Sequence, residues 1–116
     1  MNAAAIVLSL AALGGLTMLG IRLSGSPRPP TWLALGHGAI AATGIALLTY
    51  AAVTAGIPAM AQVALGLIVL AALGGITIFV LYHLKNLPLP IPIVLGHGLL
   101  ALTGLGLLWA SIYRIG

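Results

Sequence analysis

Four long apolar segments dominate the chain and restrict the folds that it can adopt. They cover roughly residues 3–21, 31–53, 63–82 and 91–113. Each holds about 20 mostly apolar residues, the length that an α-helix needs to cross the hydrocarbon core of a bilayer. Of the 116 residues, 62% are hydrophobic and only 3% are charged. We therefore expect an all-α integral membrane protein, a bundle of four transmembrane helices that forms a single membrane domain over residues 1–116 and contacts the lipid bilayer.

The first apolar segment is interpreted as a membrane helix rather than as a signal peptide. No Lys or Arg precedes it, and its length matches that of the other three segments. The sequence also lacks Cys, which excludes disulfides, thiolate metal sites and cysteine nucleophiles.

The few cationic side chains indicate how the helices cross the membrane. Arg22 and Arg28 lie in or beside the first loop and Lys85 in the third, whereas the second loop has no charge. The positive-inside rule then places loops one and three in the cytoplasm and both termini outside, as we expect for a bacterial inner-membrane protein. Arg114, near the outer C-terminus, argues weakly against this orientation.

Four scattered cations are too few for a nucleic-acid surface, so no nucleic-acid partner is expected.

An internal repeat divides the chain into two halves. Residues 1–56 align with residues 61–116 without a gap, and 19 of the 56 pairs are identical. A chain this rich in Ala, Leu and Gly would match itself by chance at roughly one position in eight, so the excess indicates a duplication. Each copy holds two helices, which makes the repeats parallel. We therefore expect two tandem helix hairpins related by a pseudo-twofold axis along the membrane normal.

The stretch "LGHG" occurs once in each repeat, at residues 35–38 and 95–98. The second and fourth helices run in the same direction, so His37 and His97 are expected at the same depth. Six residues separate Thr31 at the start of its helix from His37, which places the imidazole about 9 Å below the helix start. Two equivalent histidines that face a common axis can share one ligand.

Thr17 and Thr77 are predicted at the depth of the histidines on the first and third helices. A hydroxyl there could accept the proton of the outer imidazole nitrogen, a hydrogen bond that fixes the tautomer of a ligating histidine. Alternatively, each hydroxyl bonds to a carbonyl of its own helix.

Small residues surround each histidine and allow two interpretations. They either leave room for a flat ligand or let the helices approach closely, and Gly14, Gly15, Gly74 and Gly75 on the first and third helices are assigned to close packing. The candidates for ligand clearance flank the histidines or follow them on the same helix face: Gly36, Gly38, Ala41, Gly44, Gly96, Gly98, Ala101 and Gly104.

The leading functional hypothesis is one haem b ligated by His37 and His97. Haem iron accepts neutral imidazole axially, and the cores of helix bundles commonly hold cofactors. The two Gly-His-Gly elements and the four-helix layout resemble the membrane cytochromes b, in which paired helix histidines with nearby glycines hold haem between helices. The haem propionates would lie near Arg22, Arg28 and Lys85, with His83 as a further candidate contact.

Ligation by two histidines leaves no open iron position, which favours electron transfer over oxygen binding. A quinone or a redox protein would be the partner, and whether the chain is part of an oxidoreductase is left open.

One alternative is an assembly or accessory subunit with purely structural histidines. Another is a protein that binds or transports a transition metal or small ligand, although two imidazoles make a poor metal site. The sequence also allows either one bundle per chain or a homodimer.

Overall fold

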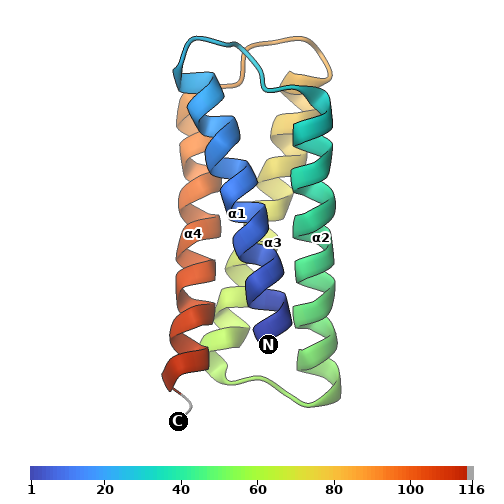
Figure 1. The fold of residues 1–116 in the computed structure, drawn as a ribbon, viewed down its shortest axis with the longest axis vertical. Coiled ribbons are helices and arrows are strands. Elements are labelled where there is room, and N and C mark those ends of the chain that lie inside the picture. Colours follow the sequence, from blue (N-terminus) through green and yellow to red (C-terminus); the bar gives the residue numbers. More distant parts are fainter. Residues whose placement is uncertain (115–116) are drawn as a thin grey trace.

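The computed structural model describes residues 1–114, which form four long helices (Figure 1). Helix α1 covers Asn2–Leu23, α2 Thr31–Thr54, α3 Ala59–Ile78 and α4 Ile91–Arg114, and the π-helical turn η1, Phe79–His83, continues α3. Counting η1 with α3, all four are long and apolar enough to cross a membrane. The prediction of an all-helical fold with four helices long and apolar enough to span a membrane is therefore confirmed.

Proline and glycine set the helix boundaries. Helices α2 and α3 begin directly after Pro30 and Pro58. Proline fixes φ near the helical value and has no N–H to leave unpaired, so it suits the start of a helix. Gly25 and Gly56 follow the ends of α1 and α2 with φ of 111° and 75°, a left-handed conformation that favours glycine.

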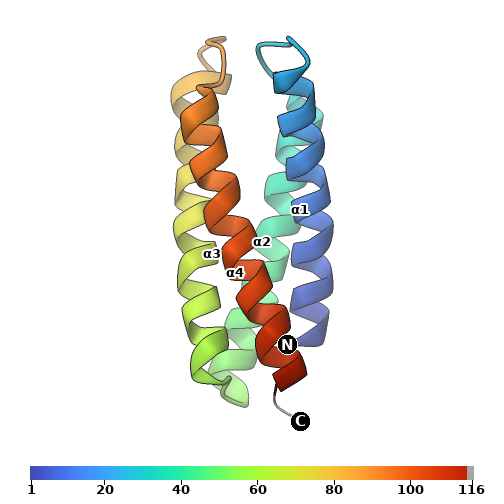
Figure 2. The same ribbon diagram turned by 90° about the vertical axis from the view of Figure 1, so that its left-hand side faces the viewer.

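The helices pair as two antiparallel hairpins, α1 with α2 and α3 with α4. The start of α1, the end of α4 and the loop between α2 and α3 lie at one end of the bundle, which we name the terminal end (Figure 1). The other two loops, residues 24–30 and 84–90, form the opposite end, which we name the basic end. The two hairpins are closest at the terminal end and diverge toward the basic end (Figure 2).

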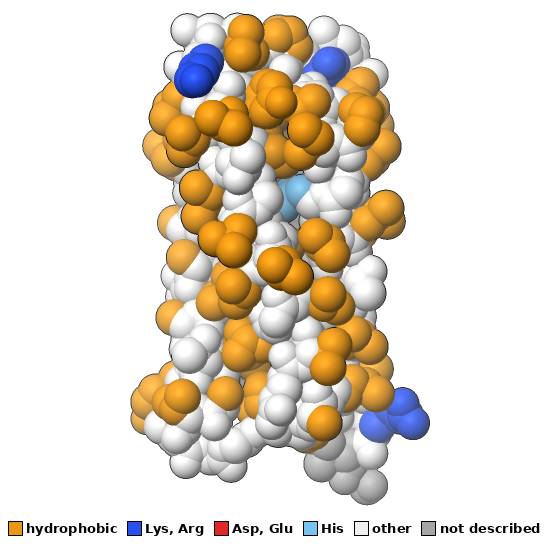
Figure 3. Space-filling view, turned by 180° about the vertical axis from the view of Figure 1, so that it is seen from behind, with side chains coloured by type: hydrophobic (Ala, Val, Ile, Leu, Met, Phe, Trp, Pro, Cys, Tyr) orange, Lys and Arg blue, Asp and Glu red, His pale blue; other side chains and the backbone are white. Residues whose placement is uncertain are grey.

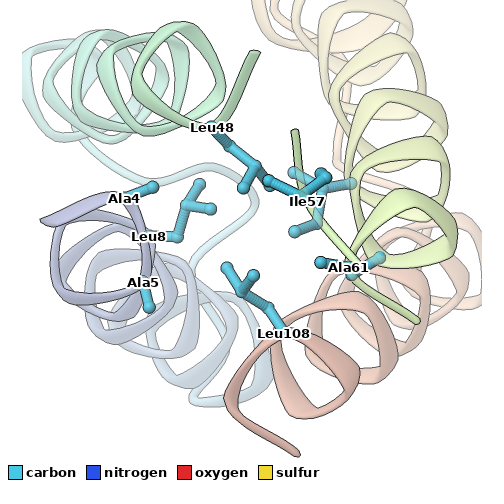
Figure 4. Packing of buried hydrophobic residues seen from close by; sticks show 9 residues of the cluster. Ala4, Ala5, Leu8, Leu48, Ile57, Ala61 and Leu108 are labelled. Carbon is cyan, nitrogen blue, oxygen red and sulfur yellow. The ribbon is translucent and has the colours of Figure 1, made fainter. Parts of the chain in front are cut away.

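The hydrophobic core lies at the terminal end. Leu48 of α2 and Leu108 of α4 are fully buried there, packed with Leu8 and with Ile57 from the connecting loop (Figure 4). Outside this core, large apolar side chains are exposed on all four helices, and apolar side chains also cover the face shown in Figure 3. Such a surface suits contact with lipid rather than with water.

Gly44 and Gly104 allow the helices of each hairpin to approach closely. A Cβ on Gly44 would lie 2.6 Å from Cδ2 of Leu8, and one on Gly104 would lie 2.7 Å from Cγ1 of Ile68. The space beside both glycines is thus filled by protein. The hypothesis that these two glycines leave room for a ligand is wrong, because they serve small-residue helix packing instead.

Hydrogen bonds connect the two hairpins at both ends. At the basic end, Leu89 N–H donates to the Pro27 carbonyl over 3.0 Å, and Arg22 Nε donates to the Leu89 carbonyl over 2.9 Å. At the terminal end, Trp109 Nε1 donates to Ser9 Oγ over 3.0 Å. These hydrogen bonds therefore hold the two hairpins together at the basic end and at the terminal end.

We expect Gly104→Val to destabilise the bundle by about 2 kcal/mol, because the new side chain must displace Ile68 and approaches the Ala64 carbonyl. Gly106→Val is the matched control on the same helix, since a Cβ at Gly106 meets no protein atom within 4 Å. Unfolding in mixed detergent micelles measures both. Equal stability of the two variants would contradict the close packing at Gly104.

Candidate functional site

Each membrane histidine is held by a backbone carbonyl of the neighbouring helix. His37 Nδ1 on α2 lies 2.7 Å from the Ala11 carbonyl oxygen on α1. His97 Nδ1 on α4 lies 2.6 Å from the Ala71 carbonyl oxygen on α3. The two histidines are 60 residues apart in the sequence, and so are the two alanines whose carbonyls they contact. The same interaction therefore occurs in each hairpin.

This hydrogen bond fixes the tautomer of both imidazoles. A carbonyl oxygen can only accept, so Nδ1 must carry the proton, and Nε2 of the neutral ring keeps its lone pair. Within residues 1–114, Nε2 of His37 and Nε2 of His97 have no hydrogen-bond partner. An imidazole whose Nδ1–H is bound to a backbone carbonyl is the usual form of a metal-ligating histidine.

Gly15 and Gly75 give the imidazoles access to these carbonyls. A Cβ on Gly15 would lie 3.1 Å from Cε1 of His37, and a Cβ on Gly75 would lie 3.0 Å from Cε1 of His97. A carbonyl inside a helix accepts a hydrogen bond from the residue four positions later and has a second lone pair free. The missing side chain at that later position lets the ring reach this lone pair.

Sequence reasoning assigned Gly15 and Gly75 only to helix packing and did not connect them with the histidines. A usable signal was present, because residues 10–15 and 70–75 are identical and form the longest unbroken match between the two repeats. Gly15 and Gly75 both lie within this match, so the sequence marks them as positions that the two halves of the chain share.

The two imidazole rings lie close together across the space between the hairpins. Their centroids are 6.3 Å apart and their planes are inclined by 85°. An imidazole–metal bond is about 2 Å long and the ring centroid lies about 1 Å behind the nitrogen, so two imidazoles on opposite sides of one ion have centroids roughly 6 Å apart. The centroid separation is thus one that two imidazoles bound to a single metal ion can have.

A cavity of about 470 Å³ extends between the hairpins around the two histidines. All four helices contribute to its wall, which is mostly apolar, and the volume falls in the range of about 300–1,000 Å³ usual for ligand and cofactor pockets. A histidine side chain is visible within a crevice between the helices in the half of the molecule nearer the basic end (Figure 3). The cavity is therefore reached from the side of the bundle.

The other small residues of the predicted site divide into two groups. Gly38, Ala41 and Ala101 line the cavity, whereas Gly36, Gly96 and Gly98 do not. At all four glycines that flank the histidines, a Cβ would meet no protein atom within 4 Å. The glycines that give an imidazole its space are thus those across from it on α1 and α3, not its neighbours in sequence.

Thr17 and Thr77 do not support the histidines. Thr17 Oγ1 donates to the Leu13 carbonyl over 2.8 Å, and Thr77 Oγ1 donates to the Leu73 carbonyl over 2.9 Å. Each hydroxyl therefore bonds to its own helix, the second of the two possibilities. The proposed contact of these hydroxyls with the outer imidazole nitrogen is wrong, because backbone carbonyls occupy that position.

The basic residues of the predicted site do not all reach the cavity. Arg22 lines it, whereas Arg28 and Lys85 do not. Arg28 instead lines a shallow groove at the basic end and donates from Nη1 to the Asn86 carbonyl over 2.9 Å. Lys85 is exposed.

His83, a further candidate contact, is buried in the wall between that groove and the cavity. Its Nε2 lies 3.0 Å from Thr31 Oγ1, and its ring stacks on Phe79 at a centroid distance of 5.0 Å. The π-helical turn that ends at His83 winds differently from the α-helix before it, and such turns are frequent at functional sites.

The described part of the chain offers too few donors for a metal ion held by side chains alone. No group of three or more His, Cys, Asp or Glu side chains occurs within residues 1–114. A tetrahedral site needs at least three protein ligands. His37 and His97 therefore suit a metal ion whose other ligands are supplied by a cofactor.

No family model, curated protein sequence or solved structure matches this chain. The function is therefore inferred from the geometry of the site.

The tautomer of the two histidines can be tested directly. In protein labelled with ¹⁵N-histidine, we expect His37 and His97 to show protonated Nδ1 and unprotonated Nε2 at neutral pH. Gly75→Leu should remove this signature from His97 alone, because the side chain occupies the space of the ring. Gly66→Leu on the same helix is the control, since its Cβ meets no protein atom within 4 Å. A His97 spectrum unchanged by Gly75→Leu would refute the packing described above.

Proposed function

We propose that the chain is a small membrane cytochrome that binds one haem b between its hairpins through His37 and His97. The observation that carries the proposal is the matched pair of imidazoles. Both have Nδ1 bound to a carbonyl, both have Nε2 without a protein partner, and their centroids are 6.3 Å apart. Haem would supply a one-electron iron couple and the further metal ligands that the chain lacks.

The described residues would orient such a group and shield it from water. The carbonyls of Ala11 and Ala71 fix both rings and make Nε2 a better electron donor to a metal. Apolar side chains form most of the cavity wall, and the buried core closes the cavity toward the terminal end. If His37 and His97 both hold the iron, the group would supply electron transfer rather than oxygen binding.

The proposal includes an arrangement in the membrane. The repeats would be related by a pseudo-twofold axis along the membrane normal that passes between the two histidines, with the basic end in the cytoplasm of a bacterial cell.

The lateral opening of the cavity supports a partner that diffuses in the bilayer, such as a quinone. A redox protein at the membrane surface is the other possible partner, and two chains could associate through their apolar outer surfaces.

Purification from membranes tests the proposal. The protein should be red, with a Soret band that shifts and sharpens when dithionite reduces the iron. We expect His37→Ala and His97→Ala each to lose most of the bound haem or the six-coordinate spectrum, because each substitution removes one axial ligand. Pyridine haemochrome analysis should give one haem per chain.

Thr17→Ala and Thr77→Ala are the matched controls, since both hydroxyls bond only to their own helices at the depth of the site. These variants should keep full haem content. A colourless protein after haem supplementation would overturn the proposal. Stable, well-folded His37→Ala and His97→Ala variants would then show that the histidines are not needed for helix packing either, whereas their misfolding would favour the assembly-subunit alternative.

A further inference from the structure

Arg22 places a positive charge at the edge of the mostly apolar cavity. Its side chain is half-buried near the end of α1 and lines the cavity together with Leu89 and His83. The sequence has no Asp or Glu, so no carboxylate side chain of the chain can neutralise this charge. A guanidinium in an apolar wall without a counter-ion is unfavourable, which suggests that the missing anion belongs to the ligand.

The guanidinium is also held in a fixed position. Arg22 Nε donates to the Leu89 carbonyl over 2.9 Å, and Leu89 N–H donates to the Pro27 carbonyl over 3.0 Å. Within residues 1–114, the two Nη groups of Arg22 have no hydrogen-bond partner. A guanidinium fixed through Nε presents two parallel N–H groups, the geometry that binds a carboxylate in bidentate fashion.

The other two cations of this end lie elsewhere. Arg28 lines the groove and Lys85 is exposed, and neither reaches the cavity wall. The second repeat provides no equivalent of Arg22, because Tyr82 occupies the matching position. The cavity is therefore charged along one edge and on the side of the first hairpin only.

We propose that Arg22 binds a carboxylate of the cavity's ligand and so fixes which way round the ligand enters. This inference rests on the proposed function, because it assigns the carboxylate to a haem propionate. The propionates project from one edge of the flat apolar macrocycle, and that edge would face the basic end. Arg22 is thus a specificity-determining residue that selects an acidic amphiphile over a neutral one of the same shape.

Haem and its dimethyl ester provide the test, since esterification removes both negative charges and leaves the macrocycle and the iron unchanged. The protein, produced without haem and held in detergent micelles, is titrated with each compound, and the Soret absorbance gives both dissociation constants. We expect the wild-type protein to favour haem over the diester by about tenfold or more, the range of a charge-assisted hydrogen-bonded pair. Arg22→Gln should reduce this preference to near unity, with diester binding unchanged.

Arg28→Gln and Lys85→Gln are the matched controls, because they remove the same charge at the same end without touching the cavity. Both should keep the wild-type preference for haem. Equal binding of haem and diester by the wild-type protein would overturn the inference while the proposed function stands. If Arg22→Gln weakened the binding of haem and of the diester equally, the inference would also be overturned while the proposed function stands. Loss of the preference for haem in Arg28→Gln would have the same consequence. Binding of neither compound by the wild-type protein would overturn the proposed function and the inference together.

Discussion

The hydrogen bond between a histidine Nδ1 and a carbonyl on the neighbouring helix is the interaction on which the rest of the site depends. In a solvent without water, an imidazole N–H left unpaired costs several kcal/mol, so each ring must find an acceptor within the protein. Inside a helix the backbone N–H and C=O groups bond to one another, and a carbonyl with a spare lone pair is the acceptor at hand. This bond also sets the tautomer and leaves Nε2 available to a ligand.

The two halves of the bundle differ in how closely their helices pack. The terminal end is closely packed, with Leu48 and Leu108 fully buried and glycine at the points of closest approach. The half nearer the basic end diverges around the cavity and is held at its edge by hydrogen bonds between the loops. Divergence of the helix pairs from a packed end thus leaves the cavity in one half of the bundle and the core in the other.

The repeat is approximate, and two of the positions at which its copies differ lie in the wall of the cavity. Ala11, Gly15 and His37 keep the same contacts as the residues 60 positions later. Arg22 and His83, by contrast, replace Tyr82 and Leu23 of the other copy. The shared part holds the two rings, whereas the differing part gives the cavity one charged edge. A ligand with two similar faces and one acidic edge matches that combination.

Hydropathy and the 60-residue repeat are properties of the chain alone, so they were enough to predict four long apolar helices and to pair His37 with His97 as candidates for one site. Which small residues and polar groups contact the two imidazoles depends instead on how the helices pack. The tertiary structure placed Leu8 and Ile68 against Gly44 and Gly104, turned Thr17 toward its own helix and put Gly15 opposite the imidazole of His37. Hydropathy cannot make these distinctions, because they depend on the rotation and separation of neighbouring helices, which packing fixes to within a few tenths of an ångström.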